Sequence, residues 1–239
     1  MTEQLFRTDA YLKDCEATVV GLNERGGVIL DRTVFYASAG GQPGDKGALE
    51  TANGACPIAT AVWEADKTNI AHVPAEGAQR PEIGDTVRAV LDWDTRHRHM
   101  RMHTALHLLC SLVKFPVTGG QIGATEGRLD FDIQDPSGID KDTLTAELNA
   151  LVSADHPVTY QWITDAQLEA NPHLVRTMSV KPPMGSGKVR LVSIGAEGSI
   201  DLQPCGGTHV RSTGEIGSLL LAKIENKGKQ NRRFRLVFA

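Results

Sequence analysis

Residues 93–116 read WDTRHRHMRMHTALHLLCSLVKFP, the first stretch of the chain that is typical of a long helix. Asp94 or Thr95 can cap its start, and the helical pattern runs to about Lys114, with Pro116 just beyond it. The pattern of apolar and turn-forming residues differs on the two sides of this stretch. We therefore expect the helix to open a second domain at residue 94.

The part before this helix consists of short apolar, β-branched runs that Gly, Pro and Asn separate. Hairpin turns are expected at residues 23–26 and 65–68. Several short strands at this spacing are typical of a small barrel, so residues 1–93 are predicted to form an N-terminal small β-barrel. The expected strands are 16–22, 27–36, 57–63, 69–73 and 86–93.

The part after the helix mixes helices and strands. A second helix fits residues 140–155, and Thr164 with Gln167 resembles a capping box for a short helix ending before Pro172. Helices and strands are segregated along the chain, which predicts an α+β fold in which residues 94–239 form a two-layer α/β domain. Strands are expected at 158–163, 189–195, 199–203, 218–225 and 232–238.

Composition limits the class of protein. The chain has 239 residues, of which 41% are hydrophobic, and lacks a run of about 18 apolar residues, so no membrane partner is expected. The first residues carry no basic start followed by an apolar core, and the four cysteines are widely spaced. These features predict a protein of the reducing cytoplasm.

Charge is distributed unevenly along the chain. The formal net charge of −4 by itself argues against a nucleic-acid partner. However, residues 1–93 carry 8 basic and 14 acidic residues, whereas residues 94–239 carry 17 and 15. The C-terminal part is therefore mildly basic, and an RNA partner for it stays open.

Two pairs of metal-ligand residues stand far apart in the sequence. His103 and His107 lie four residues apart on one face of the expected helix. Cys205 and His209 have the same spacing in PCGGTH, where Gly206 and Gly207 favour a tight turn that brings thiolate and imidazole together. Imidazole and thiolate suit zinc, so the four residues predict a site for one Zn2+ per chain. A closed, purely structural zinc site is the alternative.

Two common zinc chemistries do not fit this pattern. A zincin protease needs Glu directly after the first His, and Thr104 stands there. A nucleobase deaminase needs H-x-E and P-C-x-x-C, but Ala105 and Thr208 occupy the Glu and second Cys positions. Both alternatives lack a residue that their chemistry requires.

Four motifs in a fixed order resemble a known family. HTALH at 103–107, CGGTH at 205–209 and ENKGKQNRRFR at 225–235 are similar to the editing domain of alanyl-tRNA synthetase and to the free-standing alanyl-tRNA editing (AlaX) proteins. DRTVFYASAGGQPGDKG at 31–47 resembles the glycine-rich motif of the synthetase and of the longer editing proteins. Since no aminoacylation module precedes the motifs, the chain is more similar to the separate editing protein.

The resemblance implies an aminoacyl-tRNA hydrolase that removes serine, and in some members glycine, from the acceptor end of tRNA(Ala) and spares alanine. A synthetase pocket for alanine cannot exclude the smaller glycine and rejects the added hydroxyl of serine poorly, which makes such editing necessary. Bound zinc would either act on the ester and water or anchor the amino acid. Gln121 matches a pocket glutamine of the family, and Thr104 and Thr208 are further catalytic candidates, although Thr208 could equally hold the turn.

Basic residues provide the candidate RNA contacts. The segment from Lys223 to Arg235 contains six basic residues and one acidic residue, and beside a zinc site in an editing protein it is expected to bind phosphate. A solvated strand face is the alternative. The tRNA-binding candidates are Gly40, Gly41, Lys46, Lys227, Lys229, Arg232 and Arg233, and possible extensions of the patch are Arg96, Arg98, Arg101, Lys181, Lys188 and Arg190.

Two other classes of function remain open at this stage. One is a zinc-stabilised tRNA-binding protein without hydrolytic activity, and the other is a hydrolase of other small esters or amides. A related editing site in threonyl-tRNA synthetases shares the H-x-x-x-H and C-x-x-x-H pattern, so Ser-tRNA(Thr) is an alternative substrate. The GGQPGDKG and NKGKQNRR stretches favour the alanine system.

Overall fold

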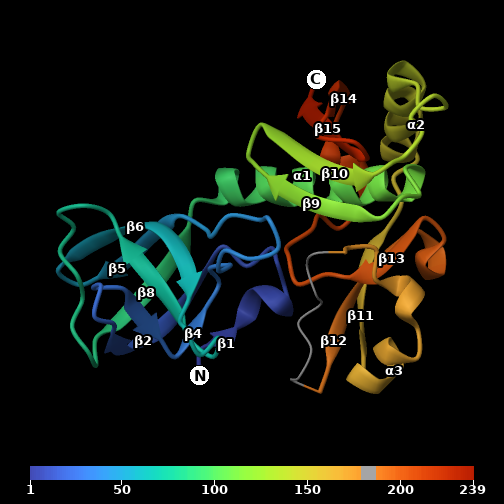
Figure 1. The fold of residues 1–239 in the computed structure, drawn as a ribbon. Helices are drawn as coiled ribbons and strands as arrows, with labels where there is room; N and C mark the ends of the chain where they lie inside the picture. Colours follow the sequence, from blue (N-terminus) through green and yellow to red (C-terminus); the bar gives the residue numbers. More distant parts are fainter. Residues whose placement is uncertain (179–186) are drawn as a thin grey trace. The chain divides into compact units, whose positions relative to one another are not determined.

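The computed structural model describes residues 1–178 and 187–239. The chain divides into two compact units, Met1–Arg98 and His99–Ala239. The border between them falls within α1, the helix Trp93–Leu112 (Figure 1). No helix in the described ranges is long and apolar enough to cross a membrane.

A closed six-stranded barrel forms the first unit, in the order β2-β3-β7-β6-β5-β8. Its interior is filled by apolar side chains that alternate along the strands, such as Val19, Leu30 and Leu49. The barrel predicted from the sequence is therefore confirmed. Its strands are β2 (Asp14–Leu22), β3 (Val28–Leu30), β5 (Gly47–Thr51), β6 (Gly54–Trp63), β7 (Ile70–Pro74) and β8 (Thr86–Leu91).

The strand expected over residues 27–36 is interrupted. After β3, the Asp31 carboxylate accepts hydrogen bonds from the backbone N–H groups of Thr18 and Arg32, at 2.8 and 2.9 Å, and the chain turns there. A short strand, β4 (Arg32–Thr33), then pairs with β1 (Glu3–Gln4) in a parallel two-stranded sheet. The expectation of one continuous strand was wrong because Asp31 forms local bonds that end it.

In the described part of the second unit, two antiparallel sheets lie together with most of α1 and two further α-helices, which confirms the α+β prediction. One sheet has the order β14-β15-β10-β9 and the other the order β11-β12-β13. The strands are β9 (Val117–Ile122), β10 (Glu126–Asp132), β11 (Val158–Ile163), β12 (Val189–Ile194), β13 (Asp201–Pro204), β14 (Leu219–Asn226) and β15 (Asn231–Phe238). The further helices are α2 (Lys141–Ser153) and α3 (Asp165–Glu169).

Helix α1 packs against the buried face of the four-stranded sheet. A Cβ atom added at Gly127 on β10 would lie 2.7 Å from Met102 Cγ and 3.2 Å from a methyl of Leu106. The glycine thus allows helix and strand to approach closely. In Figure 1, β9 and β10 run alongside this helix.

The caps of two helices can be compared with the sequence. Asp92 caps α1, because its carboxylate accepts from the Thr95 backbone N–H at 3.2 Å and from the Thr95 hydroxyl at 2.7 Å. The expected caps, Asp94 and Thr95, both lie inside the helix. For α3, Thr164 and Gln167 form the reciprocal capping box that the sequence predicted.

Candidate metal centre

Four ligand-type side chains converge in the second unit. His103 and His107 come from one face of α1, and Cys205 and His209 come from the irregular segment after β13. Their ligand atoms all lie within 4.8 Å of one another. The histidines are buried and Cys205 is partly exposed. The cluster could hold a metal ion.

The Cys205 thiol lies at the centre of these contacts. Its Sγ atom is 3.5 Å from His103 Nε2 and 3.4 Å from His209 Nε2, and the Gly207 backbone N–H donates to it at 3.4 Å. Burial alone would raise the pKa of the thiol, but His103 and His209 hold this pKa well below its usual value. Cys205 is therefore suited to the thiolate state in which cysteine binds metals.

The other three cysteines have thiol pKa values that are raised rather than lowered. Burial raises the pKa of Cys110 to about 12, and it also raises the pKa values of Cys15 and Cys56. A thiol with a raised pKa is a poor ligand and a poor nucleophile. Among the four cysteines, only Cys205 has surroundings that favour metal binding.

Asp201 orients the ring of His107. The His107 Nδ1–H donates to the Asp201 carboxylate at 2.7 Å, and the side-chain amide of Gln203 donates to the same carboxylate oxygen at 2.8 Å. Burial alone would lower the pKa of His107, but hydrogen bonds with Asp201 and Cys205 raise this pKa to about 10. The bond at Nδ1 leaves Nε2 directed to the cluster, which is the usual arrangement of a carboxylate-supported metal ligand.

Thr104 supports His209 in a similar way. Its hydroxyl donates to the Met100 carbonyl at 3.0 Å and lies 3.1 Å from His209 Nδ1. Because the single hydroxyl proton is used on Met100, His209 Nδ1–H is the donor to Thr104. The Val210 backbone N–H also donates to this oxygen at 3.3 Å. Thr104 thus lies behind the ligand and fixes its tautomer.

Arg190 on β12 holds the segment that carries Cys205. Its Nε donates to the Cys205 carbonyl at 3.0 Å and its Nη2 donates to the Gly207 carbonyl. The guanidinium is also stacked over the Tyr160 ring, 4.5 Å from the centroid. These contacts satisfy carbonyl groups of a partly buried turn that belongs to no strand or helix.

The other two catalytic candidates lie in different surroundings. Gln121 is exposed on β9 and accepts a hydrogen bond from Arg128 Nε at 3.3 Å. Thr208 is fully buried between Gly207 and His209. Gln121 can therefore meet a molecule that arrives from solvent, whereas Thr208 is covered by protein.

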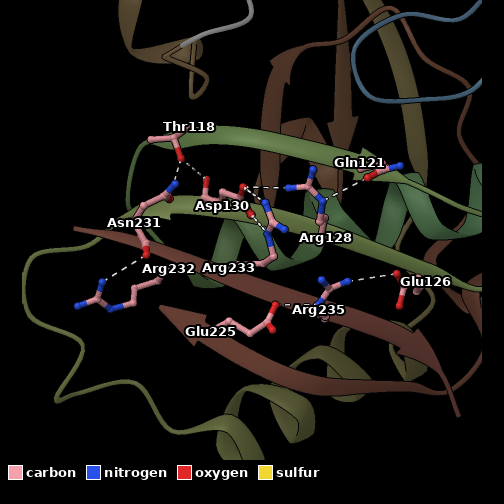
Figure 2. A network of polar contacts seen from close by, with 10 residues as sticks. All are labelled: Thr118, Gln121, Glu126, Arg128, Asp130, Glu225, Asn231, Arg232, Arg233 and Arg235. Carbon is pink, nitrogen blue, oxygen red and sulfur yellow. Dashed lines mark hydrogen bonds and ion pairs between the residues drawn. The ribbon is translucent and has the colours of Figure 1, made fainter. Parts of the chain in front are cut away.

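The basic C-terminal segment forms part of a charged sheet face (Figure 2). Asp130 binds both Arg233, with two contacts at 2.8 Å, and Arg128 at 2.9 Å. Arg232 donates to backbone carbonyls, among them that of Gly228 at 3.1 Å. Lys227 and Lys229 are exposed on the connection between β14 and β15. Within this segment, the lysines are thus more open to solvent than the arginines.

Arg235 continues this face with two acidic partners. It binds Glu225 at 2.9 Å and Glu126 at 3.2 Å. Lys223 also binds Glu225, at 3.0 Å. Contacts with Lys223 and Arg235 lower the pKa of Glu225 to about 2. The face therefore alternates charges rather than presenting a uniformly basic surface.

The glycine-rich segment of the first unit contains a tight turn. Gly40 and Gly41 have φ values of 57° and 82°, and Ala39 and Gln42 exchange backbone hydrogen bonds of 3.1 and 2.9 Å across them. Two positive φ values in a two-residue turn are typical of a type I′ turn, for which glycine is favoured. Gly40, Gly41 and Lys46 are exposed.

Several arginines that were expected to extend a basic patch make contacts within the protein instead. Arg96 is buried, bound to Asp45 and to the carbonyls of Ala10 and Val34. Arg101 donates to the Ile216 carbonyl at 2.8 Å and Arg190 is buried. These three arginines therefore do not form an exposed patch, while Arg98 and Lys188 are exposed and Lys181 lies outside the described residues.

Comparisons with known proteins show the family of the chain. The chain is 35% identical to the alanyl-tRNA editing protein AlaX-M of Methanosarcina acetivorans, over 98% of this chain and 97% of that protein. It is 34% identical to AlaX-M of Saccharolobus solfataricus, over 98% and 97%. The chain belongs to the family of alanyl-tRNA editing proteins.

Further matches relate this editing-protein chain to synthetases. It is 37% identical to alanine–tRNA ligase of Archaeoglobus fulgidus, over 94% of this chain but 24% of the ligase. Residues 189–235 match the family model of the threonyl and alanyl tRNA synthetase second additional domain, and residues 9–95 match that of class II (A) tRNA synthetases. The family resemblance drawn from the motifs is confirmed.

Two residues of this candidate site, Asp201 and Gln203, were not predicted from the sequence, and Arg190 was expected only as an extension of the basic patch. Asp201, Gln203 and Cys205 stand at alternate positions along β13 and its extension, so their side chains share one face. That alternation was a usable signal in SIDLQPC. Arg190 gave no comparable signal, because its contacts depend on the pairing of β12 with β13.

Proposed function

We propose that this chain hydrolyses the aminoacyl ester of mischarged tRNA(Ala), with Ser-tRNA(Ala) as its main substrate and Gly-tRNA(Ala) as a second one. The observation that carries the proposal is the convergence of His103, His107, Cys205 and His209 in a chain that matches alanyl-tRNA editing proteins over almost its full length. The ligases that it also matches act on the same tRNA, as their name says.

The ligand set fits zinc. With bonds of about 2.3 Å to sulfur and about 2.0–2.1 Å to nitrogen, a tetrahedral zinc ion separates these ligand atoms by about 3.5 Å. The sulfur-to-nitrogen distances from Cys205 are 3.5 and 3.4 Å. Bound there, zinc would supply a positive charge that polarises the ester or anchors the amino acid. We therefore propose one zinc ion per chain at this cluster.

The residues of the chain have separate roles in this proposal. Asp201 and Thr104 hold the Nδ1 protons of His107 and His209, so that both Nε2 atoms stay available as ligands. Gln121 keeps its amide N–H groups for the substrate, because its carbonyl oxygen accepts from Arg128. Thr208, buried in the Cys205–His209 turn, helps to keep that turn in shape. Thr104 and Thr208 are therefore positioning residues, and Gln121 is the candidate for direct contact.

The experiment uses the purified protein with tRNA(Ala) charged with serine, glycine or alanine, and with Ser-tRNA(Thr). We expect release of serine, slower release of glycine and none of alanine. A chelator should stop the release, and added zinc should restore it. Release of no amino acid from any charged tRNA would contradict the proposal and favour a tRNA-binding protein without activity. Preference for Ser-tRNA(Thr) would instead assign the alternative substrate.

The variant Cys205→Ala tests the role of the metal cluster by mutation. It should lose zinc and lower the rate of serine release at least about 100-fold, since one of four metal ligands is gone. Cys56→Ala, at a buried position in the barrel of the first unit, is the control and should keep both. If Cys205→Ala yields no folded protein, the metal is structural, and circular dichroism of the variant decides this.

A further inference from the structure

A row of three residues crosses the three-stranded sheet and ends at the metal cluster. Trp162 on β11 is paired with Arg190 on β12. Leu191 is paired with Pro204, and the Cys205 backbone N–H donates to the Arg190 carbonyl at 3.1 Å, so Cys205 stands opposite Arg190. Residues directly opposite each other in an antiparallel pair have side chains on one face. Trp162, Arg190 and Cys205 therefore share a face of this sheet.

The guanidinium of Arg190 is buried, and one of its nitrogens has no hydrogen-bond acceptor among the described residues. The side chain belongs to a residue that is only 4% exposed, and Nε and Nη2 are used on the carbonyls of Cys205 and Gly207. Nη1 is also buried, yet no group in the described ranges accepts a hydrogen bond from it. A buried, unused guanidinium N–H is costly in a folded protein unless a bound molecule supplies the acceptor.

Trp162 is exposed to solvent, in contrast to the buried Arg190. It is 48% exposed, although tryptophan is usually largely buried. Tyr160, two residues earlier on the same face of β11, lies under the Arg190 guanidinium. The exposed Trp162, the partly exposed Tyr160 and the buried Arg190 are together called the aromatic step, because they place flat rings and a hydrogen-bond donor on one face of the sheet.

Spacing connects the aromatic step to the metal cluster. Neighbouring strands are about 4.8 Å apart, so the Cα atoms of Trp162 and Cys205 are separated by two strand spacings, about 10 Å. In an aminoacyl-tRNA the ribose lies between the ester and the terminal base. A base recognised while its ester lies at the cluster must therefore lie a short distance from Cys205, as Trp162 does.

We propose that the aromatic step binds the unpaired terminal nucleoside of the tRNA, with the base stacked on Trp162 and Arg190 Nη1 donating to an acceptor of that nucleoside. This inference rests on the proposed function and adds a binding site to it. Proteins recognise single-stranded RNA ends by stacking bases on exposed aromatic rings and by arginine donors. The terminal base is suited to this because no complementary base covers its hydrogen-bonding edge.

The test measures binding and kinetics on the zinc-loaded protein. The binding probe is 3′-serylamino-3′-deoxyadenosine, whose amide bond replaces the ester, and the comparison compound is serinamide, which lacks the nucleoside. Trp162→Ala should weaken binding of the probe roughly 5- to 150-fold, the range for loss of one stacked base, and leave binding of serinamide unchanged. Trp162→Phe keeps a ring and should restore most of the affinity. Phe115→Ala, an aromatic position that is 39% exposed in the same unit, is the matched control.

Kinetics separate a binding role from a structural one. With Ser-tRNA(Ala), Trp162→Ala should raise KM by a similar factor and change kcat little, because stacking acts at a distance from the ester. Equal KM values and equal probe affinities for Trp162→Ala and Phe115→Ala would overturn the inference. If the wild-type protein deacylates no charged tRNA, the proposed function fails, and probe binding by the same preparations still decides whether the nucleoside site exists.

Discussion

Arg96 and Arg235 both bind carboxylates, but in opposite surroundings. The side chains of Arg96 and its partner Asp45 in the first unit are 0% and 2% exposed. Those of Arg235 and Glu126 on the sheet face are 29% and 58% exposed. Water can solvate either member of the second pair after its partner is removed, whereas the interior cannot do this for the first pair.

The metal cluster and the sheet face of Figure 2 differ in another way, in the number of partners of each acid, because Asp130 and Asp201 are both buried. Around the cluster, Asp201 and Thr104 are buried, and each supports a single histidine. On the sheet, Asp130 has two arginine partners that can replace each other. A polar contact with a single partner is therefore expected to have one function that depends on it, while one of two alternative contacts on the sheet face can be lost with little effect.

The largest expected effect is on the stability of the first unit. In Asp45→Ala, Arg96 remains buried without its carboxylate, and the loss of free energy of unfolding should be about 3–5 kcal/mol. Asp45 also accepts from the Tyr36 backbone N–H, at the start of the glycine-rich segment, so this segment should loosen as well. Urea unfolding, followed by circular dichroism, measures the change.

Asp14→Ala is the matched control for this experiment. Asp14 binds Arg88 at 3.0 Å in the same barrel, but these side chains are 42% and 55% exposed, so the variant should lose no more than about 1 kcal/mol. The double variant Asp45→Ala/Arg96→Met removes the unpaired charge and should regain part of the stability. Equal losses for Asp45→Ala and Asp14→Ala would show that burial does not distinguish the two pairs.

A smaller effect is expected at the second unit's metal cluster. Asp201→Asn keeps the shape of the side chain but removes the charge that fixes the His107 Nδ1–H. Loss of such a supporting contact typically lowers metal affinity 10- to 100-fold. Competition with a chromophoric zinc chelator measures this affinity. Asp130→Asn on the sheet face is the control and should leave it unchanged; a similar drop in both variants would contradict a specific role of Asp201.

The sequence predicted those features that depend on local patterns. Alternating apolar residues indicated most barrel strands, the Thr164–Gln167 spacing indicated the cap of α3, and the spacing of the two histidines within one helix placed them on one face. Strands β9 and β10 were missed, although Gly127, Leu129 and Phe131 alternate with charged residues on β10, because the glycines and charges around them are typical of a loop.

Features that depend on tertiary pairing could not be predicted in this way. Arg96 is in a helix segment with several other basic residues, which favoured an RNA-binding patch. Its role became clear only when Asp45, 51 residues away, was placed against it. Similarly, the acids that neutralise Arg233 and Arg235 come from other strands, Asp130 from β10 and Glu225 from β14. A run of basic residues in one strand says nothing about the charges of the neighbouring strands.

The smallest expected effects concern the basic segment, where the contrast between exposed and paired charges can be tested within one hairpin. Lys227 and Lys229 are exposed between β14 and β15, and if they contact phosphates, Lys227→Ala/Lys229→Ala should weaken tRNA binding several-fold. The slope of log affinity against log salt is negative, and it should become less steep by about one unit for each lysine removed. Filter binding of uncharged tRNA(Ala) at several salt concentrations measures both.

Arg233→Ala is the comparison, because its guanidinium already binds Asp130 through two contacts of 2.8 Å. This variant removes a cation that is already bound to a carboxylate, whereas the lysine variant removes two solvent-exposed cations. The salt slope should therefore change by less than in the lysine variant. Arg128 still neutralises Asp130 after the change, which limits the loss of stability. A larger fall in slope for Arg233→Ala than for the lysine pair would show that the arginine exchanges its carboxylate for a phosphate when tRNA binds, and the network would then be a binding surface rather than a support of the sheet.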